Sequence, residues 1–253
     1  MKTVLLAGGF GTRLSEETGL RPKPMVEIGG QPILTHIMGM YAKHGMKDFL
    51  IAGGYKVDFI KNYFANLPMQ LNDYKIDLKS GEVSILGTHT PDWNVSVIDT
   101  GLHTMTGGRI KRLKQHIGNE TFMCTYGDGV SDIDIAELIK FHKSHGKLAT
   151  VTAVRPPARF GSLIMDGDAV TEFEEKNAMK EGWINGGFFV LEPEVFDYID
   201  NDTQPFERKP LTSIAEAGEL MAFKHPGFWQ PMDTLREKNL LDKMANDGSA
   251  PWM

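Results

Sequence analysis

The stretch that decides the fold of this chain reads LLAGGFGTRL at residues 5–14 and is followed by RPKP at residues 21–24. Three glycines fall within four residues directly after a short apolar run, which predicts a buried strand over residues 3–6 that ends in a loop. Glycine permits backbone angles closed to other residues and lets a ligand approach the main chain. Backbone N–H groups gathered in one place suit an anion, and Arg13, Arg21 and Lys23 add positive charge. The stretch therefore predicts a cradle for a polyphosphate.

Two other phosphate-binding motifs fit this stretch poorly. In the dinucleotide fingerprint G-x-G-x-x-G the third glycine position would hold Leu14, and Pro22 and Pro24 would interrupt the crossover helix. A P-loop would need Gly-Lys followed by Ser or Thr, which the stretch lacks. A flexible turn is the plain structural alternative, and the neighbouring cations disfavour it. We therefore interpret the stretch as a phosphate site, and an NAD(P)-dependent oxidoreductase is a less favoured class.

Composition narrows the class of protein. The 253 residues carry a formal net charge of −6, which disfavours a general nucleic-acid binder, because such proteins usually present a basic face. A single cysteine, Cys124, excludes an internal disulfide and a zinc site built on several cysteines. The sequence shows no signal-peptide pattern and no apolar run long enough to span a bilayer. We therefore expect a cytoplasmic protein that has no nucleic-acid or membrane partner.

Strand and helix signals alternate along the first part of the chain. After the first strand the pattern predicts an extended piece at 25–28, a helix that Pro32 opens, a strand at 49–52, a helix at 59–64, strands at 83–86 and 95–99, a basic helix at 109–116, a strand at 122–126, a helix at 133–145 capped by Asp132, and a strand at 149–154. This alternation implies a parallel sheet with right-handed crossovers.

The second part of the chain changes character. A hairpin is predicted over 162–173, then a strand at 184–191, helical pieces near 194–198 and 211–217, a last strand at 220–223 and a closing helix at 235–244. No linker, low-complexity tract or internal repeat divides the chain. We therefore predict one α/β domain over residues 1–253.

Two aspartates are candidate metal ligands. Asp128 lies between two glycines after the strand predicted at 122–126, and ligands of open α/β sheets bind outside the carboxyl ends of the strands. Mg²⁺ commonly takes one or two carboxylates together with substrate phosphates and water. A turn aspartate that bonds to its own backbone is an equally good reading of Asp128, and helix capping is the plain reading of Asp233. On one sheet edge, the two carboxylates would share one Mg²⁺.

Other polar residues carry weaker signals. Lys176 lies close in sequence to the glycines that follow Asn185 and would hold a second phosphate, although a solvated surface lysine is the plainer reading. Arg109 begins a basic helix that we read as a solvated face, and from that position it would reach a ligand. No H-E-x-x-H pattern occurs, so we take the eight histidines as structural or surface residues.

Longer stretches of the sequence resemble a known family. The glycine stretch followed by RPKPM resembles the sugar-1-phosphate nucleotidyltransferase superfamily and, within it, the family of glucose-1-phosphate cytidylyltransferases. Supporting stretches, which span nearly the whole chain, lie at 15–18, 25–30, 105–109, 125–130, 183–190 and 227–236. One departure is Asn177, because the family usually has proline after the Glu-Lys pair.

The resemblance implies a Rossmann-like α/β domain with a mixed, mainly parallel central sheet flanked by helices. It implies transfer of CMP from CTP to α-D-glucose 1-phosphate, with Mg²⁺ as cofactor, to give CDP-glucose and pyrophosphate for surface polysaccharides such as the O-antigen of lipopolysaccharide. A uridylyl- or thymidylyltransferase is the alternative on the same fold. A non-catalytic sugar-nucleotide-binding regulator would be expected to lack Asp128 or Asp233. The family also forms homo-oligomers, including hexamers.

The resemblance also assigns roles to residues. It divides the chain into a nucleotide-binding part over about residues 1–130 and a sugar-phosphate-binding part over about residues 131–253. It places at the nucleotide Leu6, Ala7, Gly8, Gly9, Phe10, Gly11, Thr12, Arg13, Lys23, Thr104, Arg109 and Asp128. It places at the sugar phosphate Glu175, Lys176, Asn185 and Gly186. It assigns the metal to Asp128 and Asp233, and catalysis to Arg13, Lys23 and Asp128.

Overall fold

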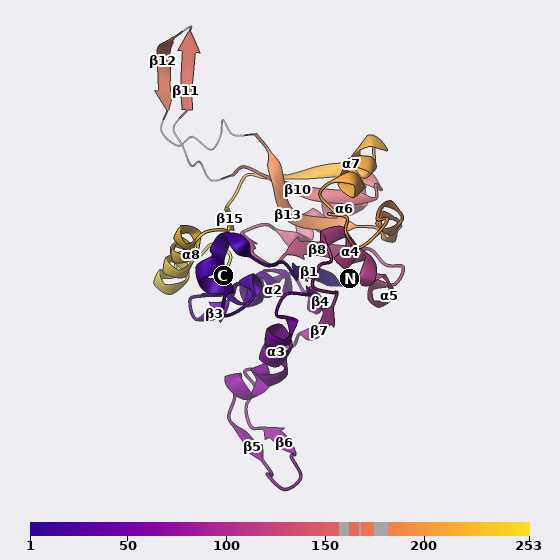
Figure 1. The fold of residues 1–253 in the computed structure, drawn as a ribbon, viewed down its shortest axis with the longest axis vertical. Helices are drawn as coiled ribbons and strands as arrows, with labels where there is room; N and C mark the ends of the chain where they lie inside the picture. Colours follow the sequence, from indigo (N-terminus) through magenta and orange to yellow (C-terminus); the bar gives the residue numbers. More distant parts are fainter. Residues whose placement is uncertain (157–161, 167, 175–181) are drawn as a thin grey trace.

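A computed structural model describes residues 1–156, 162–166, 168–174 and 182–253 (Figure 1). Its central sheet is built from β1 (Thr3–Ala7), β4 (Asp48–Gly53), β7 (Asn94–Asp99), β8 (Phe122–Tyr126), β10 (Ala149–Val154), β13 (Ile184–Leu191) and β14 (Leu220–His225). The α-helices are α1 (Ser15–Thr18), α2 (Ile33–Lys43), α3 (Val57–Leu71), α4 (Thr106–Arg112), α5 (Lys114–Ile117), α6 (Ile135–His145), α7 (Lys209–Glu216) and α8 (Leu235–Asp247). Short 3-10 helices are η1 (Thr12–Leu14), η2 (Lys23–Met25) and η4 (Pro193–Tyr198).

Further strands pair outside the central sheet. These are β2 (Glu27–Ile28) with β3 (Gln31–Pro32), β5 (Tyr74–Ile76) with β6 (Val83–Ile85), β9 (Gly129–Ser131) with β15 (Trp229–Pro231), and β11 (Ser162–Asp166) with β12 (Ala169–Glu174). The β5–β6 hairpin extends from the body of the molecule beyond the end of α3 (Figure 1).

The central sheet is mixed and mainly parallel. Its strand order is β14-β10-β13-β8-β1-β4-β7. Neighbouring strands are parallel except at β13, which runs antiparallel to both β8 and β10. The α/β fold predicted from the alternation of strands and helices is therefore confirmed.

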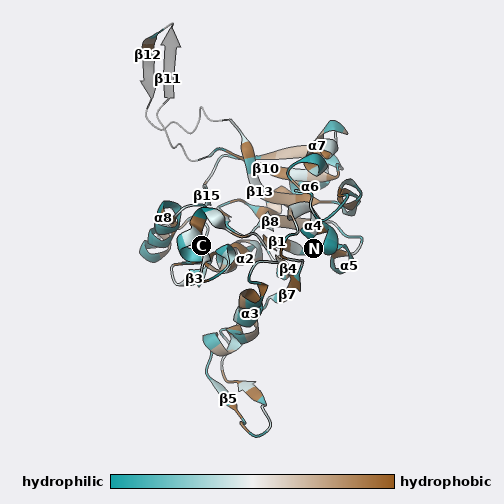
Figure 2. Ribbon diagram, in the orientation of Figure 1, coloured by the Kyte–Doolittle hydropathy of each residue, from teal (hydrophilic) through white to brown (hydrophobic). Residues whose placement is uncertain are grey.

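Two hydrophobic cores cover the two faces of this sheet. In β1 the side chains of Leu5 and Ala7 enter one core, and those of Val4 and Leu6 enter the other, because successive residues of a strand point to opposite faces. Residues of α2, α3, α6 and α8 complete the first core, and residues of α4, α5 and α7 complete the second. Figure 2 shows hydrophobic colour gathered in the sheet strands and hydrophilic colour over outward helices such as α8. None of the helices in the described ranges is long and apolar enough to cross a bilayer.

The antiparallel strand β13 brings distant residues to one edge of the sheet. Ile184, at its start, pairs with Val154 at the end of β10, and Phe188 pairs with Thr125 near the end of β8. The first residues of β13 therefore lie at the edge where the parallel strands end. A ligand at that edge is expected to meet loops from both halves of the chain.

Several sequence-based boundaries are wrong. The helix predicted at 133–145 starts at Ile135 and is capped by Asp134, which accepts the Glu137 N–H at 3.0 Å, and not by Asp132. Asp132 instead contacts Nε2 of His225 at 2.9 Å. The strand predicted to be the last is followed by β15, whose three residues are too few to show a period. The helix predicted at 59–64 runs over Val57–Leu71, and its buried residues Val57, Ile60 and Leu67 lie on one face that extends beyond the predicted range.

Candidate active site

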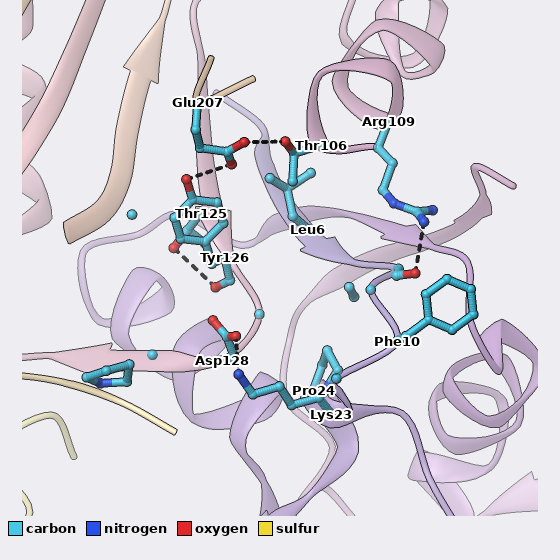
Figure 3. A pocket seen from close by; sticks show the side chains of 18 of the residues that line it. Leu6, Phe10, Lys23, Pro24, Thr106, Arg109, Thr125, Tyr126, Asp128 and Glu207 are labelled. Atoms are coloured by element: carbon cyan, nitrogen blue, oxygen red, sulfur yellow. Dashed lines mark hydrogen bonds and ion pairs between the residues drawn. The ribbon is translucent and has the colours of Figure 1, made fainter. Parts of the chain in front are cut away.

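A cleft of about 760 Å³ opens at the carboxyl edge of the sheet, a volume that suits a nucleotide-sized ligand (Figure 3). The residues that line it come from seven stretches of the sequence and are Leu6–Arg13, Lys23, Pro24, Leu102–Thr106, Arg109, Thr125–Gly129, Asn185–Phe188, Glu207, Trp229, Pro231 and Asp233. The loop after β1 contributes its whole glycine stretch to this lining. The site residues predicted within the described ranges are therefore neighbours around one cleft.

The glycine loop turns sharply into η1. Gly11 has a φ of 65°, in the left-handed region that favours glycine, and its carbonyl accepts the Leu14 N–H at 3.0 Å. The Thr18 hydroxyl donates to the same carbonyl at 3.2 Å. The exposed side chain of Phe10 packs against the rings of Tyr55 and His103, with centroid distances of 5.3 and 6.0 Å. The loop is thus held from several sides.

Arg109 holds this loop through hydrogen bonds of its guanidinium group. Arg109 is only 4% exposed, so the interpretation of the basic helix as a solvated face is wrong at this position. The guanidinium donates to the carbonyls of Gly8 (2.8 Å), Gly53 (2.9 Å) and Gly101 (2.8 Å) and to the hydroxyl of Thr100 (2.7 Å). A Cβ atom at Gly8 would overlap this guanidinium, which explains a glycine there. Arg109 therefore connects the carboxyl ends of β1, β4 and β7 beside the cleft.

Lys23 lies between the two predicted metal ligands. The residue is 6% exposed, and its Nζ lies 2.6 Å from Oδ2 of Asp128 and 2.6 Å from Oδ1 of Asp233. Arg13 adds an ion pair of 2.7 Å to the other carboxylate oxygen of Asp233. Burial alone lowers the pKa of Lys23, but the two carboxylates outweigh it, so its pKa is raised above the ordinary 10.5. The sequence separations of 105 and 210 residues show that the fold assembles this charge cluster.

A short ladder and a helix cap place Asp233 beside Asp128. Strand β15 pairs with β9, and the Met232 N–H donates to the Asp128 carbonyl at 2.8 Å. The cap of α8 is Thr234, in a capping box with Glu237, so helix capping does not explain Asp233. The Asp233 side chain is thereby left to face the cleft.

Asp128 and Asp233 are placed so that both could contact one divalent cation. They approach the same ammonium group, so a single cation can contact both. Among the described residues there is no group of three or more His, Cys, Asp or Glu side chains that could hold a metal. A divalent ion here would therefore take its remaining ligands from phosphate and water, which is the usual coordination of Mg²⁺ in proteins.

The structure adds residues that the sequence did not single out. Glu207 accepts hydrogen bonds from the hydroxyls of Tyr126 (2.7 Å) and Thr106 (2.6 Å), as Figure 3 shows. The Tyr126 hydroxyl also accepts from Nδ2 of Asn185 at 3.2 Å. A short β15 strand adds Trp229, whose indole N–H donates to the Gly186 carbonyl at 2.8 Å. No local pattern marks Glu207, because it lies in a loop far from its partners in sequence.

The remaining predicted residues divide into three groups. Thr12, Thr104, Asn185 and Gly186 line the cleft. Arg21 pairs with Glu27 at 2.5 Å and does not line the cleft, so the third cation expected beside the loop serves elsewhere. Glu175 and Lys176 lie outside the described residues.

The chain belongs to the nucleotidyl transferase family, which matches residues 2–234. Among curated proteins it is 54% identical to "Glucose-1-phosphate cytidylyltransferase" of Salmonella typhi over 253 residues, which are 100% of this chain and 98% of that protein. It is 43% identical to "Probable glucose-1-phosphate cytidylyltransferase" of Bacillus subtilis, again over 253 residues, 100% of this chain and 99% of that protein. The family resemblance predicted from the sequence is therefore confirmed.

A solved structure shares the fold. A putative glucose-1-phosphate thymidylyltransferase from Bacillus anthracis superposes with a TM-score of 0.70 at 19% identity, over 98% of this chain and 96% of that chain. At this identity the likeness supports the nucleotidyltransferase architecture alone.

Proposed function

We propose that this protein is an enzyme that transfers CMP from CTP to α-D-glucose 1-phosphate, giving CDP-glucose and pyrophosphate. The identity of 54% to a curated glucose-1-phosphate cytidylyltransferase, over the full chain, is the observation that carries the choice of nucleotide and sugar. The arrangement of the cleft agrees with the reaction class, since the glycine loop, the cations Arg13 and Lys23, and the carboxylates Asp128 and Asp233 lie together at one sheet edge.

The reaction asks little acid–base chemistry of the protein. A sugar-phosphate oxygen is already anionic and attacks the α-phosphorus in line while pyrophosphate leaves, so catalysis depends on positioning and charge neutralisation. The glycine loop would hold the nucleotide through Leu6–Gly11, with Thr104 and Arg109 beside it. Lys23 and Arg13 would neutralise the phosphates, Arg13 on the departing pyrophosphate together with Thr12.

Mg²⁺, held by Asp128 and Asp233, would neutralise charge on the triphosphate and orient it for attack. Before a ligand binds, Lys23 supplies the positive charge between these two carboxylates. Once Mg²⁺ is bound there, the Lys23 ammonium group would contact the phosphates instead. Asn185 and Gly186, with Glu175 and Lys176, would hold the sugar phosphate.

A substrate panel tests this proposal. Pyrophosphate release is measured with CTP, UTP, dTTP, GTP and ATP, each with glucose 1-phosphate, with and without excess EDTA. We expect turnover with CTP and Mg²⁺, and loss of turnover with EDTA. Turnover with UTP or dTTP but not CTP would replace the cytidylyl assignment with the uridylyl or thymidylyl one.

Three further expectations from the sequence stay predictions. They are the assembly into homo-oligomers such as hexamers, the cytoplasmic location, and a role in O-antigen synthesis. The division into a nucleotide-binding part over about residues 1–130 and a sugar-phosphate-binding part over about residues 131–253 is likewise proposed. Sedimentation velocity would test the assembly.

A further inference from the structure

A carboxylate that the reaction above does not use faces the cleft. Glu207 precedes α7 and lines the cleft on the side away from Lys23 and Asp128 (Figure 3). Both substrates of the proposed reaction are anions, so a negative charge among the lining residues disfavours their phosphates. The same carboxylate is well suited to a neutral hydroxyl group, because an ionised carboxylate is an acceptor only.

Thr106 and the loop before α7 fix this carboxylate in place. The Thr106 hydroxyl accepts the Phe206 N–H at 2.8 Å, so it directs its own proton to Oε2 of Glu207, 2.6 Å away. The Gly107 N–H donates to the Gln204 carbonyl at 3.0 Å, and a Cβ atom at Gly107 would lie 2.5 Å from that oxygen. A glycine is thus required for the loop to pack so closely against α4.

Tyr126 fixes the other carboxylate oxygen. Its hydroxyl donates to Oε1 of Glu207 at 2.7 Å and accepts from Asn185 at 3.2 Å. Burial first, and then the charge of Glu207, raise the pKa of Tyr126, so the phenol keeps the proton that it donates. Each oxygen of Glu207 accepts one of these bonds and has a further lone pair for a ligand.

We propose that Glu207 accepts a hydrogen bond from a hydroxyl group of the sugar in the sugar 1-phosphate, with Thr106 and Tyr126 as positioning residues. This inference rests on the proposed function, which puts the sugar phosphate at Asn185. The contact of Asn185 with Tyr126 joins that side of the cleft to Glu207. Ribose hydroxyls of the nucleotide are the other source of the same chemistry, and the experiment separates the two.

The test compares substrates that lack one hydroxyl each. Initial rates with saturating CTP and Mg²⁺ are measured for α-D-glucose 1-phosphate and its 2-, 3-, 4- and 6-deoxy analogues. In the wild-type protein we expect one analogue to show a kcat/KM about 10- to 100-fold lower, the range for a hydrogen bond to a charged group. In Glu207→Ala, kcat/KM for the parent sugar should fall by the same factor, and that analogue should no longer be discriminated.

Three variants separate sugar binding from a structural role. Glu207→Gln keeps the size of the side chain and should lose part of the discrimination between glucose 1-phosphate and the affected deoxy analogue. Tyr126→Phe should lose less of this discrimination, and for the same analogue. Asp200→Asn removes an exposed carboxylate of the neighbouring loop, which pairs with Lys209 at 2.8 Å, and should keep the wild-type pattern.

Two results of the rate measurements would overturn the inference. One is an equal loss of activity with every analogue in the Glu207 variants, which indicates a structural role. The other is altered discrimination between CTP and its 2′- or 3′-deoxy forms, which indicates ribose binding. If the wild-type protein shows no turnover, the proposed function fails, and calorimetry with glucose 1-phosphate then decides about Glu207. Weaker binding by Glu207→Gln supports the inference, whereas equal binding, or none by the wild type, overturns it.

Discussion

Lys23 and Arg109 are two nearly buried cations that line the same cleft, and they differ in what surrounds them. Lys23 contacts two carboxylates, whereas Arg109 contacts backbone carbonyls at the ends of three strands and a hydroxyl. Side-chain carboxylates are anionic and can reorient, so another cation can replace the lysine ammonium group beside them. Carbonyls are fixed by the main chain. We therefore expect that a bound cation can replace Lys23 between the two carboxylates, and that Arg109 stays in place as part of the scaffold.

The largest effect is expected at Asp128, on the exchangeable side. Asp128→Asn should lower kcat by roughly 100- to 1,000-fold, because a charge that orients the triphosphate is lost. Its side chain is 30% exposed and lies at the cleft, so the melting temperature should stay close to that of the wild type. Pyrophosphate release at saturating Mg²⁺ and thermal melting measure the two quantities.

Asp92→Asn is the matched control for Asp128→Asn. It removes a surface carboxylate that pairs with Lys47 at 2.6 Å, and we expect wild-type turnover. Near-wild-type turnover of Asp128→Asn itself would show that this carboxylate is not needed for the reaction.

The second effect concerns Arg109, on the scaffold side. Arg109→Met should lower the free energy of unfolding by about 2–3 kcal/mol, because buried carbonyls lose hydrogen bonds to a charged donor. Urea denaturation measures this change, and exposed Lys114→Met on the adjacent helix should stay within about 0.5 kcal/mol. Unchanged stability together with weaker CTP binding would instead make Arg109 a ligand residue.

The third effect joins the charge cluster to the metal. Lys23→Met leaves Asp128 and Asp233 facing each other without the ammonium, so Mg²⁺ should bind there more readily. The MgCl₂ concentration is set at ten to twenty times the dissociation constant of the variant for Mg²⁺. At that concentration we expect the metal to stabilise the variant by about 1–2 kcal/mol more than the wild type. Thermal melting with and without MgCl₂ measures this difference, and Lys47→Met is the control. Equal stabilisation of both proteins would place the metal elsewhere.

The smallest effect is expected at Thr234, the N-cap of α8, which directly follows Asp233. Thr234→Ala removes the hydroxyl that accepts the Glu237 N–H at 3.3 Å and should cost about 1 kcal/mol of unfolding free energy. Thr234→Ser keeps the cap and should behave as the wild type in chemical denaturation. If Thr234→Ser loses as much unfolding free energy as Thr234→Ala, the loss comes from the methyl group and not from the cap.

Much of the sheet could be predicted because its signals are local. The sequence predicts strands at 122–126, 149–154 and 184–191 with the boundaries that the structure has, since each stretch is rich in β-branched or aromatic residues and is flanked by turn residues. The three residues of β15 gave no such signal, although they position Asp233. The start of α6 was misplaced because Asp132 and Asp134 are both good capping residues and only packing chooses between them.

The sequence by itself determined a phosphate-binding loop, an α/β alternation and, through resemblance, a family. The glycine stretch and Arg-Pro-Lys-Pro are contiguous, and a local motif needs no knowledge of distant contacts. Only the tertiary structure decided that Lys23 lies between Asp128 and Asp233, that Arg109 holds carbonyls, and that Glu207 faces the cleft. Those arrangements depend on the strand order, on the pairing of β15 with β9 and on the packing of the loop before α7 against α4, which bring together residues separated by up to 210 positions.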